Sequence, residues 1–116
     1  YIRIHADGIN NSSISGVSVL TASAKNRYLS PAVQKASEKL SKDILAEYLK
    51  TTGAQNRGIS YRDDLTGTNW SKIPTTLIEL GFMSNPAEDR KMSTKEYQDK
   101  MVSGIVNGLE KYYREK

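Results

Sequence analysis

Glu79 is the residue whose position in the sequence is hardest to explain by stability alone. It lies inside the apolar stretch Leu77-Ile78-Glu79-Leu80, where an ionised carboxylate loses its water at a cost on the order of several kcal/mol unless a cation or strong donors compensate. One interpretation is a general acid/base or a metal-associated carboxylate near the end of a strand, where α/β sheets commonly hold their ligands. The other is a structural glutamate that pairs with an arginine or caps a buried amide.

His5 is the single histidine of the chain, and it stands near the end of a short alternating stretch. A lone histidine is either a structural residue or a metal ligand. Zinc in hydrolases normally takes three protein ligands and leaves one position for water, and the sequence offers neither a second histidine nor a cysteine. We therefore expect this chain to hold at most part of a zinc site.

Asn69 and Trp70 are weaker candidates for substrate binding. Both lie in residues 63–72, which are rich in turn formers and predict a loop. The two side chains would form a substrate-facing lip; the alternative is a loop anchored by one buried aromatic ring.

Three strands are expected to position these residues. Residues 1–6 alternate with period two, residues 16–21 are rich in β-branched side chains, and residues 75–80 are almost continuously apolar. The last pattern is typical of a strand buried on both faces of a parallel or mixed sheet. Residues 56–58 are expected to turn, and residues 59–62 predict a further short strand.

Helices are expected between and after these strands. Ser30-Pro31 supplies an N-cap and a proline at the first helical position, and Gly53 is a suitable end for that helix. Two later helices should begin at capping boxes, in which a polar N-cap residue is followed three positions later by glutamate: Asn85 with Glu88, and Ser93 with Glu96.

The alternation of strands with helices predicts an α/β fold with a mostly parallel or mixed sheet flanked by helices, a three-layer sandwich. At 116 residues the chain fits a single domain, residues 1–116. Tyr1 already stands inside a strand pattern, so we expect the N-terminal part of this domain to be missing.

The net charge and its distribution limit the kinds of molecule that the protein is expected to bind. The net charge is +4, and the excess of lysine and arginine is diffuse rather than clustered with aromatic residues. A diffuse positive surface favours anionic polymers such as cell wall, nucleic acid or lipid headgroups, but the pattern argues against specific nucleic-acid binding. No apolar run is long enough for a membrane span.

Several stretches resemble one known family in order and spacing along the whole chain. Ile4-His5-Ala6-Asp7 resembles the second histidine motif of the zinc-dependent N-acetylmuramoyl-L-alanine amidases, a group of bacterial autolysins, spore-cortex amidases and phage endolysins. Residues 74–85, which run from Pro74 through Glu79 to Asn85, resemble its second signature. Residues 56–58 and 64–72 also match its pattern.

The resemblance implies a secreted, cell-wall peptidoglycan hydrolase that cleaves the amide between N-acetylmuramic acid and L-alanine of the stem peptide. It implies Zn²⁺ as the cofactor, His5 as a metal ligand and Glu79 as the catalytic acid/base. The family carries two more zinc ligands N-terminal to the point where this chain begins. We therefore expect a fragment that is inactive alone, with the remaining N-terminal part of the same catalytic domain as its partner.

Two alternatives stay open. The chain could be a non-catalytic wall-binding or regulatory module with a degenerate amidase fold, or a general α/β domain that binds an anionic polymer. Residues upstream of Tyr1 would separate the first from the enzyme, and salt-sensitive nucleic-acid binding would favour the second.

Overall fold

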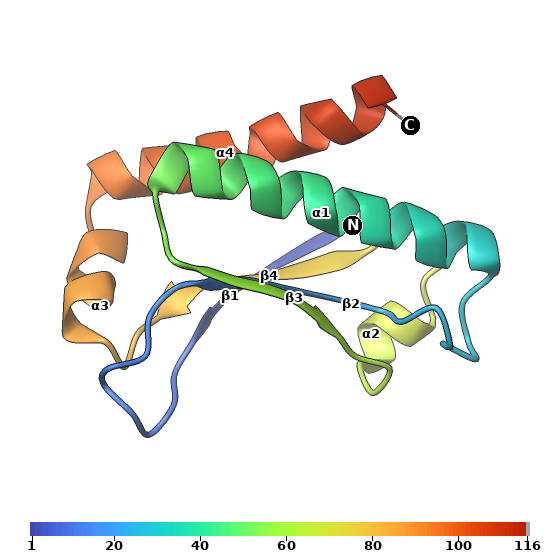
Figure 1. Cartoon of the computed structure of the whole chain (residues 1–116), viewed down its shortest axis with the longest axis horizontal. Helices are drawn as coiled ribbons and strands as arrows, with labels where there is room; N and C mark the ends of the chain where they lie inside the picture. The colour runs from blue at the N-terminus through green and yellow to red at the C-terminus, as the bar shows by residue number, and fades with distance from the viewer. Residues whose placement is uncertain (116) are drawn as a thin grey trace.

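Strands and helices alternate along the chain, as the sequence predicts. The computed structural model describes residues 1–115 (Figure 1), and its elements are, in chain order, β1 (Ile2–Asp7), β2 (Val17–Thr21), α1 (Pro31–Thr52), β3 (Asn56–Tyr61), α2 (Thr66–Asn69), β4 (Thr76–Phe82), α3 (Pro86–Met92) and α4 (Lys95–Glu115). None of the helices in this described part combines the length and the apolarity needed to cross a lipid bilayer.

The four strands form one mixed sheet in the order β1-β4-β2-β3. β1 is parallel to β4 and β2 is parallel to β3, whereas β2 and β4 are antiparallel. The predicted α/β class with a mixed sheet is therefore confirmed. Since β4 has a partner on each side, it is an interior strand, which accounts for its nearly continuous apolar sequence.

Helix α1 begins and ends where its capping residues predict. The Ser30 hydroxyl accepts a hydrogen bond from the Val33 amide at 3.2 Å, and Pro31 occupies the first turn. Gly53 ends the helix in the left-handed conformation, with φ of 68°. Leu40, Ile44 and Tyr48 of this helix are buried in the core against the sheet and α4.

Two glycines let α4 lie directly against α1. A Cβ atom added at Gly104 would lie 2.7 Å from the Cα of Tyr48, and one added at Gly108 would lie 2.5 Å from the Cα of Ile44. Both distances are too short for real side chains, so the two helix backbones meet at these positions. The sequence patterns described above do not predict this close approach.

The predicted turn at residues 56–58 is wrong, because these residues form the first half of β3. Val17 pairs with Asn56 and Val19 pairs with Ile59, so β3 contains one residue more than β2 over this interval. Gly58 has φ of 81°, which is typical of a β-bulge. The turn-forming residues therefore serve a bulge inside a strand.

Two further local predictions need correction. α4 is capped by Thr94 rather than by Ser93: the Thr94 hydroxyl accepts from the Tyr97 amide at 3.2 Å, while Ser93 ends α3. The predicted loop of residues 63–72 contains the single turn α2.

The two faces of the sheet differ in their cover. α1 and α4 lie on one side and α2 lies on the other (Figure 1). Val17, Val19 and Ile78 belong to the core beneath α1 and α4. Because side chains alternate along a strand, the neighbouring residues His5 and Glu79 project from the opposite face, the side on which α2 lies.

Candidate functional site

His5 and Glu79 meet because β1 and β4 are paired in parallel register. Their Cα atoms are direct partners across the two strands, and Ser18 of β2 is the partner of Glu79 on its other side. The Nδ1 atom of His5 lies 3.8 Å from Oε1 of Glu79. Residues 74 positions apart in the sequence are thus brought together on one face of the sheet.

The Glu79 side chain is largely shielded from solvent, and its Oε2 atom is buried without a partner among the described residues. This side chain is only 14% exposed, against 46% for His5. Within residues 1–115, Oε2 of Glu79 has no hydrogen-bond partner, and no lysine or arginine pairs with the carboxylate. A structural glutamate would be expected to use both oxygens. This arrangement does not match the arginine-paired or amide-capping alternative.

Burial raises the pKa of Glu79 above the ordinary glutamate value, because the desolvated site disfavours the charged form. The carboxylate of Asp7 raises this pKa further, while His5 lowers it. A carboxyl group whose pKa is displaced toward neutrality can both accept and return a proton under ordinary conditions. The geometry therefore suits a general acid/base.

A metal ion fits this pair only in part. An imidazole beside a buried carboxylate oxygen without a partner is a donor set that suits zinc. However, residues 1–115 contain no group of three histidine, cysteine, aspartate or glutamate side chains placed to hold a metal. The described residues therefore do not by themselves form a three-ligand metal group.

The two predicted substrate-binding residues have different environments. Asn69 is only 7% exposed, and its amide is used inside the protein: Oδ1 accepts from Asn26 and Nδ2 donates to the carbonyl of Asp63. Trp70 is 73% exposed, so the alternative of a loop anchored by a buried aromatic ring is wrong. Asn69 is the residue that anchors the loop, and Trp70 faces solvent.

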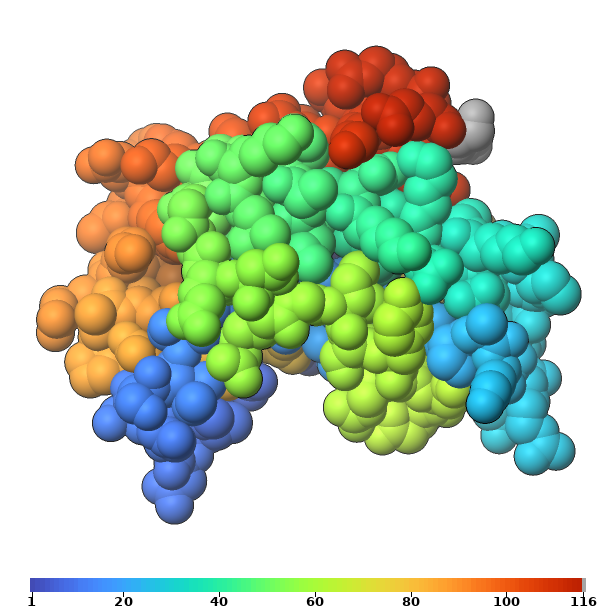
Figure 2. Space-filling model, viewed as in Figure 1, coloured from blue at the N-terminus to red at the C-terminus, as the bar shows by residue number. Residues whose placement is uncertain are grey.

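Trp70 lies on the same side of the sheet as the His5–Glu79 pair. It follows α2 directly, and a Cβ atom at Gly67 of α2 would lie 3.4 Å from Nη1 of Arg3. Arg3 precedes His5 by two residues, about 7 Å along β1. Figure 2 shows the surface hollowed between the segment that follows β1 and the segment that contains α2.

Glu88 is a residue that the sequence analysis misassigned. The Asn85 half of the predicted capping box is present, since its side chain accepts from the Glu88 amide at 3.0 Å. The Glu88 carboxylate does not return to Asn85. It accepts from the amide of Phe82 at 2.6 Å and from that of Gly16 at 3.0 and 3.1 Å, and so joins the end of β4 to the start of β2.

The Glu88 carboxylate serves as acceptor for two backbone amides, those of Phe82 and Gly16, at the ends of two strands. A Cβ atom at Gly81 would lie 2.8 Å from the Glu88 carboxylate, so the glycine after Leu80 makes room for it. In the sequence, the spacing from Gly81 to Glu88 is the only feature that points to this contact. That spacing does not show whether the Glu88 carboxylate caps its own helix or binds the amides of the two strand ends.

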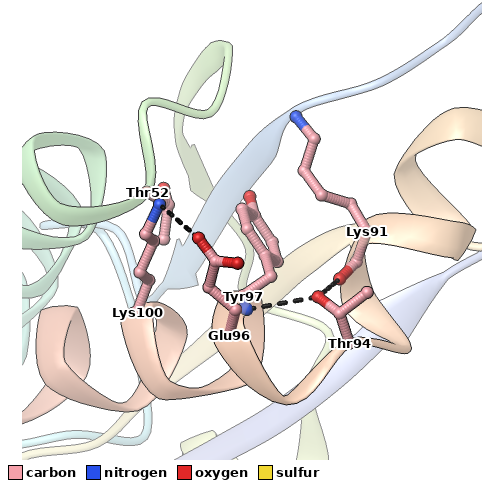
Figure 3. Close-up of a pocket in the computed structure, with 6 residues that line it drawn as sticks. All are labelled: Thr52, Lys91, Thr94, Glu96, Tyr97 and Lys100. Atoms are coloured by element: carbon pink, nitrogen blue, oxygen red, sulfur yellow. Dashed lines mark hydrogen bonds and ion pairs between the residues drawn. The ribbon is translucent and has the colours of Figure 1, made fainter.

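A separate groove of about 300 Å³ lies between α1, α3 and the start of α4 (Figure 3). Its polar groups mostly serve the helix termini: the Thr94 hydroxyl donates to the Lys91 carbonyl and accepts from the Tyr97 amide. Lys100 lies 3.8 Å from Glu96. Neither His5 nor Glu79 lines it, so this groove is not part of the candidate site.

Known proteins with similar sequences include cell-wall amidases. The sequence profile of the N-acetylmuramoyl-L-alanine amidase family matches residues 1–111. The uncharacterised protein YqiI of Bacillus subtilis is 35% identical over 77 residues, which are 66% of this chain and 37% of YqiI. The probable cell wall amidase LytH of Staphylococcus epidermidis is 28% identical over 113 residues, or 97% of this chain and 35% of LytH.

The fold is similar to that of a solved amidase. The CwlD amidase of Clostridioides difficile, solved in complex with the GerS lipoprotein, superimposes with a TM-score of 0.86 at 28% identity, over 99% of this chain and 54% of the CwlD chain. The chain thus spans about half of that solved protein and about a third of the two curated relatives. Because the family profile extends over nearly the whole sequence, this chain belongs to the N-acetylmuramoyl-L-alanine amidase family.

Proposed function

We propose that this chain carries the acid/base half of a peptidoglycan amidase site. The reaction is hydrolysis of the amide between the lactyl group of N-acetylmuramic acid and L-alanine of the stem peptide. The observation that carries the proposal is the buried Oε2 atom of Glu79, which has no hydrogen-bond partner among the described residues. The other carboxylate oxygen, Oε1, lies 3.8 Å from Nδ1 of His5. Membership of the amidase family supplies the substrate class.

In this mechanism Glu79 moves protons. It accepts a proton from the water whose oxygen attacks the scissile carbonyl, and it returns that proton to the amine nitrogen as the carbon–nitrogen bond breaks. Its raised pKa suits both steps, because the carboxyl must hold the proton between them. When bound, zinc supplies Lewis-acid chemistry that lowers the pKa of water and polarises the carbonyl.

His5 would be one of the protein ligands of that zinc ion, and its exposed imidazole is accessible from the open face of the sheet. We propose that the other ligands come from polypeptide outside these 116 residues, since the described residues hold no group of three. The coverage of only 54% of the solved CwlD chain is consistent with this division.

The edge of the sheet at β1 offers a surface for that additional polypeptide. Among the described strands β1 pairs with β4 alone. Two cavities, of about 470 and 210 Å³, open beside it: Ala6 and Met101 help to line the first, and Tyr1 and Leu109 the second. Ile4 is exposed on this strand. An open strand edge flanked by apolar cavities is suited to pairing with a further strand.

We further propose that the protein acts on the cell wall outside the cytoplasm; the relative LytH is named a probable cell wall amidase. The net charge of +4 is consistent with attraction to an anionic wall.

A second candidate function is a non-catalytic wall-binding or regulatory module. The lack of a three-ligand group within residues 1–115 favours it. The two functions differ in the complete protein: the module would bind peptidoglycan without holding stoichiometric zinc and without releasing stem peptides.

The test of the enzyme uses the complete domain with zinc content and muramyl-peptide cleavage measured on the same samples. Glu79→Ala should abolish cleavage while zinc is retained, because it removes the proton carrier and not a ligand. His5→Ala should lower both zinc and cleavage. Substantial turnover by Glu79→Ala would remove Glu79 from the mechanism, and full zinc in His5→Ala would remove His5 from the ligand set.

A further inference from the structure

Two exposed aromatic rings lie in contact with each other at the end of α2. The ring centroids of Tyr28 and Trp70 are 5.8 Å apart, with their planes tilted by 44°. Tyr28 is 59% exposed and Trp70 is 73% exposed. Large aromatic side chains gain free energy by burial, so an exposed pair held in contact indicates a surface that binds something.

A network of polar side chains holds the segments that carry both rings. The amide nitrogen of Asn26 donates to the Asp63 carboxylate at 2.9 Å and to Oδ1 of Asn69 at 2.8 Å, while its Oδ1 accepts from the Tyr28 amide at 2.9 Å. Nδ2 of Asn69 donates to the Asp63 carbonyl at 2.8 Å. The backbone at Tyr28 is thereby held through Asn26, and the backbone next to Trp70 is held through Asn69.

This fixed geometry matters for binding, because a surface that is already ordered loses little conformational entropy when a ligand arrives. Tyrosine and tryptophan provide a large, rigid and amphipathic contact area. Asp63 belongs to the same polar network, and hydrogen bonds from Ser23 and Asn26 lower its pKa. A pair of rings ordered in this way is suited to stacking against the flat face of a ligand.

We infer that Tyr28 and Trp70 form a stacking platform for an N-acetylated sugar ring of the glycan strand. The inference rests on the proposed function, which makes peptidoglycan the substrate class. The platform and the His5–Glu79 pair belong to the same side of the sheet, with α2 next to Arg3 on β1. A glycan held at the platform can therefore present its peptide branch toward Glu79.

Trp70 is the only tryptophan of the chain, so its fluorescence reports on the platform without a label. The experiment titrates the chain with chitotetraose, a neutral oligomer of N-acetylglucosamine, and separately with a sugar-free stem peptide. Chitotetraose should produce a saturable change in emission, and the stem peptide should produce none. A response to the peptide alone, or no response to the sugar up to millimolar concentration, overturns the inference.

Variants then locate the contact. Tyr28→Ala keeps the fluorescent reporter and should weaken chitotetraose binding roughly three- to tenfold, the range expected for one aromatic contact. Tyr113→Ala is the matched control, because Tyr113 is similarly exposed, at 62%, but lies on α4. It should bind like the unmodified chain. Equal binding by Tyr28→Ala overturns the platform.

Trp70→Leu, measured by calorimetry, provides a second test that does not depend on Tyr28→Ala folding. It should also lose roughly three- to tenfold in affinity. Both titrations work without zinc or catalysis. Sugar binding by a protein that cleaves no amide would contradict the proposed function alone, whereas cleavage by a protein whose binding is unchanged in Trp70→Leu would contradict the platform alone.

Discussion

Replacing Glu79 by glutamine should make the metal-free chain more stable at neutral pH. Most substitutions of buried residues destabilise a protein, so a gain here would be unusual. The reason is that the carboxylate is only 14% exposed, with Oε2 lacking any partner among the described residues. An ionised group in this position costs free energy that a neutral amide of the same shape does not.

The size of the gain follows from the single unsatisfied oxygen. Leaving one buried polar group without a partner costs about 1–3 kcal/mol, and more when the group is charged. The glutamine amide still lacks a partner, which cancels part of the gain, and the approach of His5 already offsets part of the charge cost. A net stabilisation of about 1 kcal/mol is expected, which corresponds to a rise of roughly 0.5–1 M in the urea midpoint.

The gain should depend on pH in one direction. The pKa of Glu79 is raised in the folded chain, so the folded state binds the proton more tightly than the unfolded state does. Ionisation therefore destabilises the fold, and this cost is present in full above the raised pKa. The cost disappears below about pH 4, where both states are protonated. The advantage of Glu79→Gln should be largest at pH 7 and shrink on acidification.

Urea unfolding followed by circular dichroism, with a chelator present, measures this difference. Glu110→Gln is the matched control, since Glu110 is an exposed residue of α4, and its midpoint should change little. A clear loss of stability in Glu79→Gln at pH 7 would refute the reasoning, because it would mean that the carboxylate is a satisfied structural group.

Three other perturbations have definite expected outcomes. Gly108→Ala should lower the thermal midpoint by several degrees, since the clash with the Ile44 backbone costs about 1–3 kcal/mol and the gain in helix propensity is about 1 kcal/mol. Asn107→Ala, at an exposed position of the same helix, should leave the thermal midpoint unchanged. Calorimetry of the two variants measures the difference. Glu88→Ala should speed amide hydrogen exchange at Phe82 and Gly16, which lose their acceptor, whereas Glu88→Gln should retain most of the protection. His5→Ala should raise the pKa of Glu79, because His5 lowers it, and carbon NMR of the carboxyl group measures the change.

The fold was predictable wherever a local pattern and a tertiary role coincide. Ser30, Pro31 and Gly53 define α1 because capping depends on neighbours in the sequence. The prediction failed at Gly58, where turn-forming residues serve a β-bulge. Whether a left-handed glycine turns the chain or bulges a strand depends on a partner strand that is distant in the sequence, and local periodicity carries no information about that partner.

The sequence pointed to the two central residues of the candidate site, but not to the residue that holds the neighbouring strand ends together. Glu79 is conspicuous because a charge in an apolar strand violates a local rule, and His5 because it is the single histidine. Glu88 violates no local rule, since glutamate at the third position of a helix is ordinary. Its carboxylate serves Phe82 and Gly16 instead, and the second of these residues lies 72 positions away. Only three-dimensional contact shows such a brace.

Burial is the largest cause of the raised pKa of Glu79, and the two charged neighbours that adjust this pKa both lie on β1. His5 lowers its pKa and Asp7 raises it, and both residues belong to the last part of β1, where the register with β4 shifts between them. Because side chains alternate, a slip of one residue in this pairing would turn His5 to the helix-covered face and away from Glu79. The register of β1 against β4 shifts only after His5, so His5 stays paired with Glu79 while Asp7 pairs with Phe82. The register of an edge strand thus determines whether the buried acid has a basic neighbour at all.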